Sequence, residues 1–280
     1  MTQAGSARRK NPAASRELAG LSLSESHYPA GLRQPRHAHE PASFSLVLSG
    51  GYDERIGRRH NFNCLPATVV FRPPDESHSV AFADSPVTIF RLDLSASWLD
   101  GLREAGAAPP GAARFAAGEP LWAAVRLRRE FASADQFSEL AVESLVLELV
   151  AAASEMLARR ADVRRRRDDA KRPPRWLERA REMLREEMHD APTVAQVARA
   201  VGVHPVHLAH EFRRYYGTGA GEYARRARVS YACRLLARTR LPLSQVAALS
   251  GFYDQSHLTN SFRRATGVTP AQYRSALSAS

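Results

Sequence analysis

The sequence has few cysteines and no long apolar run. Its 280 residues include two cysteines, Cys64 and Cys233, which are too few and too far apart for a disulfide framework, so we expect a reducing cytoplasm. No stretch approaches the roughly 18 apolar residues that a membrane-spanning helix needs. The basic N-terminus is not followed by the apolar run of a secretory signal. These absences argue against a disulfide-stabilised or membrane-spanning protein and predict a soluble one.

Acidic residues are scarce in the C-terminal part of the chain. The net charge is +11, yet residues 1–158 carry 16 Lys/Arg against 18 Asp/Glu. Residues 159–172 carry 8 against 3, and residues 173–280 carry 16 against 8. A basic domain joined to a near-neutral one indicates a polyanion-binding part and a part with another task. Charge alone does not identify nucleic acid, because many soluble basic proteins bind nothing acidic.

A unit of about twenty residues occurs twice in the basic part. The first copy, VARAVGVHPVHLAHEFRRYYG, begins at Val197, and the second, VAALSGFYDQSHLTNSFRRATG, begins at Val246. The copies are offset by 49 residues up to Gly202 and Gly251, and by 50 residues after them. Each copy has the pattern of a helix, a short turn containing glycine and a second helix, which is typical of a helix-turn-helix unit. Two such units predict a protein that reads DNA.

Local signals place the helices of both units. Thr193 with Gln196 three residues later predicts a capping box at the start of the first supporting helix. Pro205 suits the first turn of the following helix, and Gln255 or Ser256 is expected to begin its counterpart. Apolar pairs at i, i+4 on these second helices are expected to face the core; they are Leu208 with Phe212 and Leu258 with Phe262.

The second helix of each unit is expected to enter the major groove. Its polar side chains can bond base edges, and its arginines suit phosphates. We expect the second copy to contribute more to specificity, because small apolar Val206 and Ala209 occupy reading positions in the first. Structural roles are favoured for His207 and His257, beside the core leucines. The predicted DNA-binding residues are Val206, Ala209, His210, Arg213, Arg214, Gln255, Ser256, His257, Thr259, Asn260, Arg263 and Arg264.

Residues 176–277 resemble the DNA-binding domain of AraC/XylS-family transcriptional regulators. The most diagnostic part is LPLSQVAALSGFYDQSHLTNSFRRATGVTPAQYR, residues 241–274. The resemblance implies two successive major-groove contacts on one face of DNA, about 34 Å apart. His204 departs from the family, which prefers a serine-like cap there, so we expect the first recognition helix to begin less firmly.

The N-terminal part alternates short apolar runs with turn signals over residues 30–95, which predicts an antiparallel barrel or sandwich. From about Pro120 the apolar residues take helical spacing. A wide apolar stripe on residues 137–157 is typical of a core and sometimes of a subunit interface, so self-association is left open.

This N-terminal part resembles the cupin-like sensor domains that often precede such DNA-binding units. Gly31, followed by His37 and His39, matches the opening of the first cupin motif, and His78 falls in the second. The three histidines are an acceptable set for Zn or Fe(II), but Ser43 stands where a metal-binding glutamate is usual. Because sensors of this family generally keep the barrel without the metal, we assign no metal, cofactor or catalytic residue. We expect His37, His39 and His78 to line or rim an effector pocket.

The sequence therefore predicts an α+β protein of two domains. A flexible tail is expected at 1–25, a cupin-like β-barrel with a helical dimerisation segment at 26–158, a basic linker at 159–175 and an all-α double helix-turn-helix domain at 176–280. We expect a cytoplasmic transcription regulator without enzymatic activity. Its expected partners are double-stranded DNA, a small-molecule effector and, if it activates, RNA polymerase; a homodimer is left open. A metal-dependent cupin enzyme fused to a DNA-binding domain and a ligand-independent oligomeric DNA-binding protein remain alternatives.

Overall fold

The computed structural model describes residues 14–58, 60–133, 138–169, 173–186 and 192–277. The chain forms two compact units. One unit holds the residues up to Glu155 together with those from Arg274 onward, and the other is Met156–Tyr273. None of the helices in the described ranges is long and apolar enough to cross a membrane.

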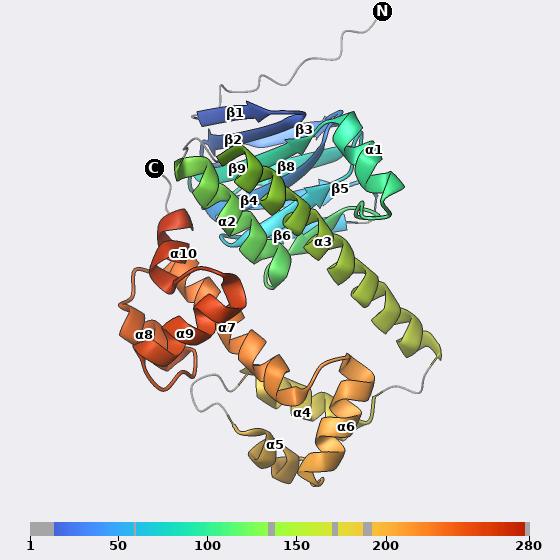
Figure 1. Ribbon diagram of the computed structural model, residues 1–280, viewed down its shortest axis with the longest axis vertical. Helices are drawn as coiled ribbons and strands as arrows, with labels where there is room; N and C mark the ends of the chain where they lie inside the picture. Colours follow the sequence, from blue (N-terminus) through green and yellow to red (C-terminus); the bar gives the residue numbers. More distant parts are fainter. Residues whose placement is uncertain (1–13, 59, 134–137, 170–172, 187–191, 278–280) are drawn as a thin grey trace, which may run out of the picture. The chain divides into compact units, whose positions relative to one another are not determined.

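The first unit is built on two antiparallel sheets (Figure 1). The six-stranded sheet has the order β1 (Ala14–Leu18), β2 (Leu21–Tyr28), β9 (Val87–Leu94), β4 (Ala42–Ser49), β7 (Thr68–Arg72) and β10 (Ala113–Phe115). The four-stranded sheet has the order β3 (Arg33–His37), β8 (His78–Phe82), β5 (Tyr52–Ile56) and β6 (His60–Cys64). The prediction of an antiparallel β domain is confirmed. The prediction of a closed barrel is corrected, because among the described strands no pairing joins the two sheets and both stay open.

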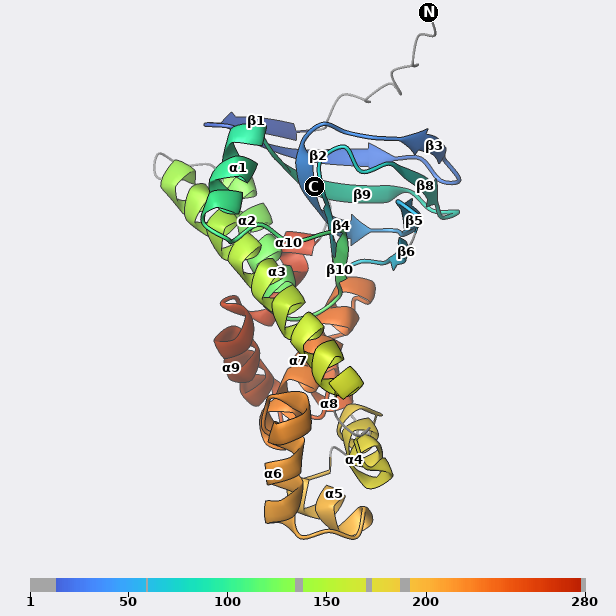
Figure 2. The same cartoon turned by 90° about the vertical axis from the view of Figure 1, so that its right-hand side faces the viewer.

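The six-stranded sheet is covered on both faces. Figure 2 shows α1 (Ala96–Glu104), α2 (Glu119–Ser133) and the first part of α3 (Ser138–Asp169) on one side of the strands and the four-stranded sheet on the other. Side chains alternate along a strand, so Phe44 and Leu46 of β4 face the helices while Ser43 and Ser45 face the second sheet. Double coverage explains why every residue of β4 except the last is buried.

Two boundaries differ from the prediction. The prediction of a flexible tail at 1–25 is wrong from Ala14 onward, because β1 pairs with β2 from Ala14↔Glu25 to Leu18↔Leu21. Residues 1–13 lie outside the described residues. The alternation of buried Leu21 and Leu23 with serines is the strand signal that the prediction overlooked. Helix α3 continues to Asp169, within the predicted linker 159–175, because arginine and alanine are good helix formers.

The second unit is helical, and α7 (Ala220–Arg238) lies at its centre. Before it come α4 (Arg175–Glu186), α5 (Val194–Ala200) and α6 (Pro205–Tyr216), and after it come α8 (Leu243–Leu249), α9 (Gln255–Thr266) and the start of α10 (Pro270–Leu277) (Figure 1). Leu177, Val197, Leu208 and Phe212 form one core cluster together with Ala220 and Ala224 at the beginning of α7. Helices α8 and α9 pack against α7 as well, so one long helix supports both predicted units.

Candidate functional sites

The two helix-turn-helix units share their backbone geometry. The turn glycines Gly202 and Gly251 have φ angles of 72° and 71°. This left-handed region is open to glycine without the steric cost that other residues incur. Gly217 and Gly267 end α6 and α9 with φ angles of 71° and 78°. The repeat in the sequence is thus a repeat in the structure, with both helix boundaries at equivalent residues.

Each unit also contains an equivalent pair of packed aromatic rings. Phe212 meets the ring edge of Tyr223 with 5.3 Å between centroids, and Phe262 meets Tyr273 at the same distance. The two phenylalanines and the leucines four residues before them are fully buried, so the predicted core pairs are confirmed. Their burial turns the other faces of α6 and α9 outward.

The predicted DNA-binding residues lie on those outward faces. Eleven of the twelve are exposed, and Thr259 is half-buried. The hydroxyl of Thr259 donates to the carbonyl oxygen of Gln255 at 2.8 Å, which leaves its oxygen free only to accept. The exposure is what groove contact requires, and the contact itself stays a prediction.

The recognition helices begin with different caps. Asp254 precedes α9 and accepts the backbone N–H of His257 at 2.7 Å, while His204 precedes α6 and accepts the N–H of Val206 through Nδ1 at 3.3 Å. An imidazole therefore replaces the serine-like cap of the family, with a longer hydrogen bond. The expected capping box of α5, Thr193 with Gln196, is present.

His207 and His257 both contact neighbouring aromatic rings. The His207 ring lies 5.4 Å from that of Trp176, and the His257 ring meets the edge of Phe252 at 5.4 Å. Nδ1 of His257 also accepts the backbone N–H of Tyr253 at 3.4 Å. These contacts support the structural roles expected for both residues.

Glu211 is a residue that the sequence prediction missed. It is only 9% exposed, and its carboxylate lies 3.1 Å from His210 Nδ1 and 3.5 Å from Arg214 Nη1. Burial raises its pKa, but the hydrogen bonds from His210 and Arg214 outweigh this and hold the pKa below its usual value. The equivalent residue in the second unit is Ser261. His210, one of the predicted DNA-binding residues, is therefore held by an acidic neighbour that α9 does not have.

In the first unit the three predicted histidines come together. His37 of β3 and His78 of β8 are partners in the strand register, and His39 follows two residues later. The ring centroids are 4.3 Å apart for His37–His78, 4.9 Å for His37–His39 and 5.2 Å for His39–His78. Their candidate ligand atoms all lie within 4.8 Å of one another. An effector-binding role for this cluster remains a prediction.

The cluster is electrostatically suited to uncharged imidazoles. Burial lowers the pKa of His39 to about 3, and the positive charge of Arg91 contributes to the shift. Burial likewise lowers the pKa of His78 to about 3, with a contribution from Arg72. Both rings are therefore neutral near pH 7 and keep a lone pair for a ligand.

A buried ion pair lies beside the histidines, and the sequence prediction missed it too. Arg72 of β7 forms a two-pronged contact with Glu54 of β5, in which Nη2 donates to Oε2 at 2.9 Å and Nε donates to Oε1. Arg72 also donates to Ser45 Oγ at 2.8 Å and to Ser43 Oγ at 3.4 Å. Burial opposes its charge, but the Glu54 carboxylate raises the pKa of Arg72 above its ordinary value. Ser43, at the usual position of the metal-binding glutamate, thus faces a guanidinium.

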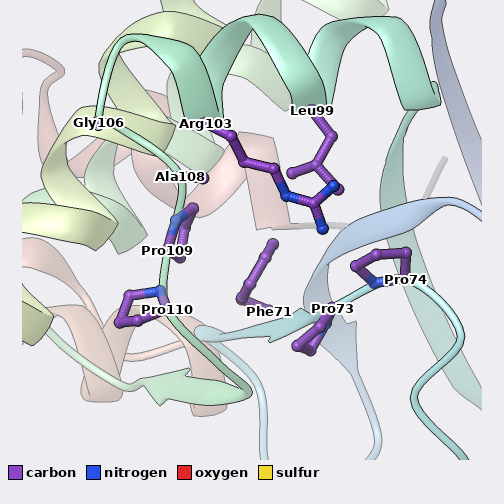
Figure 3. A pocket seen from close by; sticks show the side chains of 9 residues that line it. All are labelled: Phe71, Pro73, Pro74, Leu99, Arg103, Gly106, Ala108, Pro109 and Pro110. Carbon is purple, nitrogen blue, oxygen red and sulfur yellow. The ribbon is translucent and has the colours of Figure 1, made fainter.

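A separate cavity of ≈ 350 Å³ opens on the helix-covered side of the first unit (Figure 3). Its walls come from β7 and the turn after it, from α1 and from the segment after α1. The lining residues are Phe71, Pro73, Pro74, Leu99, Arg103, Gly106, Ala108, Pro109 and Pro110. Arg103 is ion-paired with Asp100 at 3.0 Å. The predicted histidines are not part of its lining.

Comparisons with known proteins match both parts of the chain. A model of the AraC-like ligand-binding domain matches residues 18–150, and a helix-turn-helix domain model matches residues 197–276. The arabinose operon regulatory protein of Escherichia coli (strain K12) is 35% identical over 81 residues, which is 29% of this chain and 28% of that protein. The HTH-type transcriptional regulator GlxA of Rhizobium meliloti is 37% identical over 78 residues, 28% of this chain and 24% of that protein. The matched segment spans less than a third of the length of these curated relatives.

Solved structures show similarity at low TM-scores. The C-terminal domain of AraT, a response regulator from Geobacillus stearothermophilus, is 28% identical, with 38% of this chain and 88% of that chain covered and a TM-score of 0.36. Unsaturated fatty acid bound ToxT from Vibrio cholerae strain SCE256 is 12% identical, with 95% and 96% covered and a TM-score of 0.38. The two domain matches fall in the predicted order on one chain. The chain therefore belongs to the AraC/XylS family, with an AraC-like ligand-binding domain ahead of its helix-turn-helix domain.

Proposed function

We propose that this chain is a sequence-specific DNA-binding transcription regulator whose N-terminal unit binds a small-molecule effector. The observation that carries the proposal is the pair of equivalent helix-turn-helix units, each of which turns a basic recognition helix toward solvent. The surplus of positive charge in residues 173–280, with 16 Lys/Arg against 8 Asp/Glu, suits the phosphate backbone.

The two recognition helices have unequal tasks in this proposal. Helix α9 reads bases, because Gln255 and Asn260 are exposed and carry the paired donor and acceptor that match adenine. Helix α6 contributes mainly affinity, because its reading positions are apolar and Glu211 engages His210 and Arg214. Phosphate contacts from the exposed arginines that end both helices position the chain on the duplex.

The N-terminal unit serves as the sensor. An effector that binds one arrangement of the chain more tightly than another shifts the population toward that arrangement and so changes DNA binding. The role is one of binding, not catalysis, and the working location is the cytoplasm. If the protein activates transcription, RNA polymerase is a further partner.

We propose that a second copy of the chain packs against the exposed face of α3. Leu140 and Leu147 are 75% and 50% exposed, and they lie seven residues apart, which places them on one side of the helix. Large apolar side chains in such a row are a typical helix–helix contact. Analytical ultracentrifugation of the wild type and of Leu140→Glu/Leu147→Glu tests this. We expect the wild type to sediment as a dimer and the double variant as a monomer. Equal molecular masses of the two proteins in solution would contradict the proposal.

A gel-shift titration tests the function itself. The full chain is mixed with the DNA upstream of its own gene and of the neighbouring genes, with scrambled DNA of equal length as competitor. We expect salt-sensitive binding that prefers one of the natural fragments. Asn260→Ala should reduce the preference, while Glu104→Ala, on the other unit, should not. Equal affinity for natural and scrambled DNA would overturn the proposal.

A further inference from the structure

The turn between the two helices of the second unit contains a residue that the first unit lacks. Four residues, 201–204, separate α5 from α6, whereas five residues, 250–254, separate α8 from α9. We propose that the additional residue, Tyr253, binds the DNA backbone, with its phenolic hydroxyl donating a hydrogen bond to a phosphate oxygen. This contact rests on the proposed DNA-binding function and lies outside the set of predicted DNA-binding residues.

Main-chain hydrogen bonds on the glycine side of the turn show where the two units correspond. The N–H of Val203 donates to the carbonyl oxygen of Ala198 at 2.9 Å, and the N–H of Phe252 donates to that of Ala247 at 3.0 Å. Val203 and Phe252 are 49 positions apart, as are Ala198 and Ala247. The two turns are therefore equivalent up to Val203 and Phe252.

Main-chain hydrogen bonds on the other side of the turn show the same correspondence one residue later. The N–H of Leu208 donates to the carbonyl oxygen of His204, and the N–H of Leu258 donates to that of Asp254, both at 3.0 Å. These pairs of residues are 50 positions apart. Tyr253 alone has no counterpart, so the second unit adds one side chain in front of its recognition helix.

The added side chain faces solvent. Tyr253 is 93% exposed, whereas Phe252 before it is 5% exposed. No protein group in the described ranges forms a hydrogen bond with the hydroxyl of Tyr253. Tyrosine combines an apolar ring with a polar tip, and such side chains are enriched where a protein meets a partner. Because Tyr253 contributes little to the core, its role is expected in binding.

The backbone that carries this side chain is held in place. The N–H of Tyr253 donates to Nδ1 of His257, in the first turn of α9, at 3.4 Å. The carboxylate of Asp254, the next residue, accepts the N–H of His257 at 2.7 Å, so it is engaged by the helix backbone. A side chain on a fixed backbone loses less freedom when it binds a partner.

The position of Tyr253 suits a phosphate better than a base edge. The N-terminal residues of a recognition helix enter the major groove, and in α9 these are Gln255 and Ser256. Tyr253 precedes them, so we expect it at the edge of the groove, where the phosphates lie. Tyrosine side chains donate to phosphate oxygens in protein–DNA complexes. The N-terminal end of α9 also provides a positive potential that favours an anion.

A phenol–phosphate contact differs from the other expected contacts in two measurable ways. The phenol is uncharged, so its contact displaces no counterion and leaves the salt dependence of binding unchanged. The phosphate is the same under every base, so the contact adds affinity for any DNA sequence. Loss of an arginine contact would instead change the salt dependence, and loss of a base contact would change the sequence preference.

Tyr253→Phe tests the contact because it removes the hydroxyl alone. The full chain is titrated, in fluorescence anisotropy at several salt concentrations, with the natural DNA fragment that it binds best and with scrambled DNA. We expect Tyr253→Phe to bind both DNAs about three- to thirtyfold more weakly, as the loss of one hydrogen bond predicts, with an unchanged salt slope. Its midpoint of thermal unfolding should equal that of the wild type, because the side chain is exposed.

Tyr28→Phe is the matched control. It removes the same hydroxyl from a tyrosine of the first unit, where the Tyr28 ring stacks on that of Phe82, and it should bind both DNAs as the wild type does. Equal affinity of Tyr253→Phe and the wild type would overturn the phosphate contact, and so would a loss confined to the natural fragment. The proposed regulatory function fails on a different result, a wild type without preference for natural DNA, and scrambled DNA would still report the phosphate contact.

Discussion

Arg72→Met removes the guanidinium from the interior of the N-terminal unit, and the effect on stability should be large. The side chains of Arg72 and Glu54 are 4% and 0% exposed. The substitution leaves Glu54 buried without its partner, and breaking a buried ion pair in this way costs about 3–5 kcal/mol of unfolding free energy. At about 2–4 °C per kcal/mol for a unit of this size, the midpoint of thermal unfolding should fall by roughly 6–20 °C.

A double variant separates the ion pair from simple loss of packing. In Arg72→Met/Glu54→Leu neither charge of this pair remains, and replacing a whole pair by apolar groups is often neutral. Most of the lost stability should therefore return. Arg55→Met, on the exposed face of β5, is the control and should change the free energy by less than about 0.5 kcal/mol. Differential scanning calorimetry of the full chain measures all four proteins. A loss below about 1 kcal/mol for Arg72→Met, or a double variant no more stable than Arg72→Met, would show that the buried ion pair does not act in this way.

Three further predictions concern the helical unit. Asn260→Ala should cost about 1–3 kcal/mol of discrimination between bound and mismatched operators, whereas Ala209→Ser should change it little; equal selectivity of the two in competition binding would refute this asymmetry. Glu211→Gln should free His210 and Arg214 for DNA. The slope of log affinity against log salt concentration, measured by fluorescence anisotropy, should then steepen by up to about one unit. An unchanged slope would show that the carboxylate does not restrain the two side chains. Gly202→Ala should lower unfolding stability by about 1–2 kcal/mol through its φ of 72° alone, since nothing lies within 4 Å of an added Cβ. Gly221→Ala, within α7 and outside the left-handed region, should be neutral or slightly stabilising, and equal losses in the two variants would contradict the strain argument.

The helical unit was predictable because its signals are local. Glycine turns, the Thr193–Gln196 capping box and Pro205 each act within one or two helical turns, and the structure has them where the sequence placed them. The sequence prediction did not include Glu211, because the burial of this residue depends on how α6 packs. Its contacts with His210 and Arg214 are seen in the structure.

The N-terminal unit was less predictable because its pairings are distant. Whether ten strands close into a barrel depends on which edges meet, and no residue pattern in a single strand states that. Glu54 and Arg72 lie 18 residues apart on strands of different sheets, so nothing in the sequence linked them. The histidine cluster was anticipated because a motif placed all three residues at the mouth of one β structure.

In the proposed function, two helix-turn-helix units of one chain contact one face of DNA. Hydroxyl-radical footprinting of the full chain on DNA selected by it from a random pool tests this most directly. We expect two protected patches per chain, about 10–10.5 base pairs apart. The DNA under the α9 patch should share a base pattern, and Asn260→Ala should weaken it. A single protected patch, or selected DNA without a shared pattern, would contradict it.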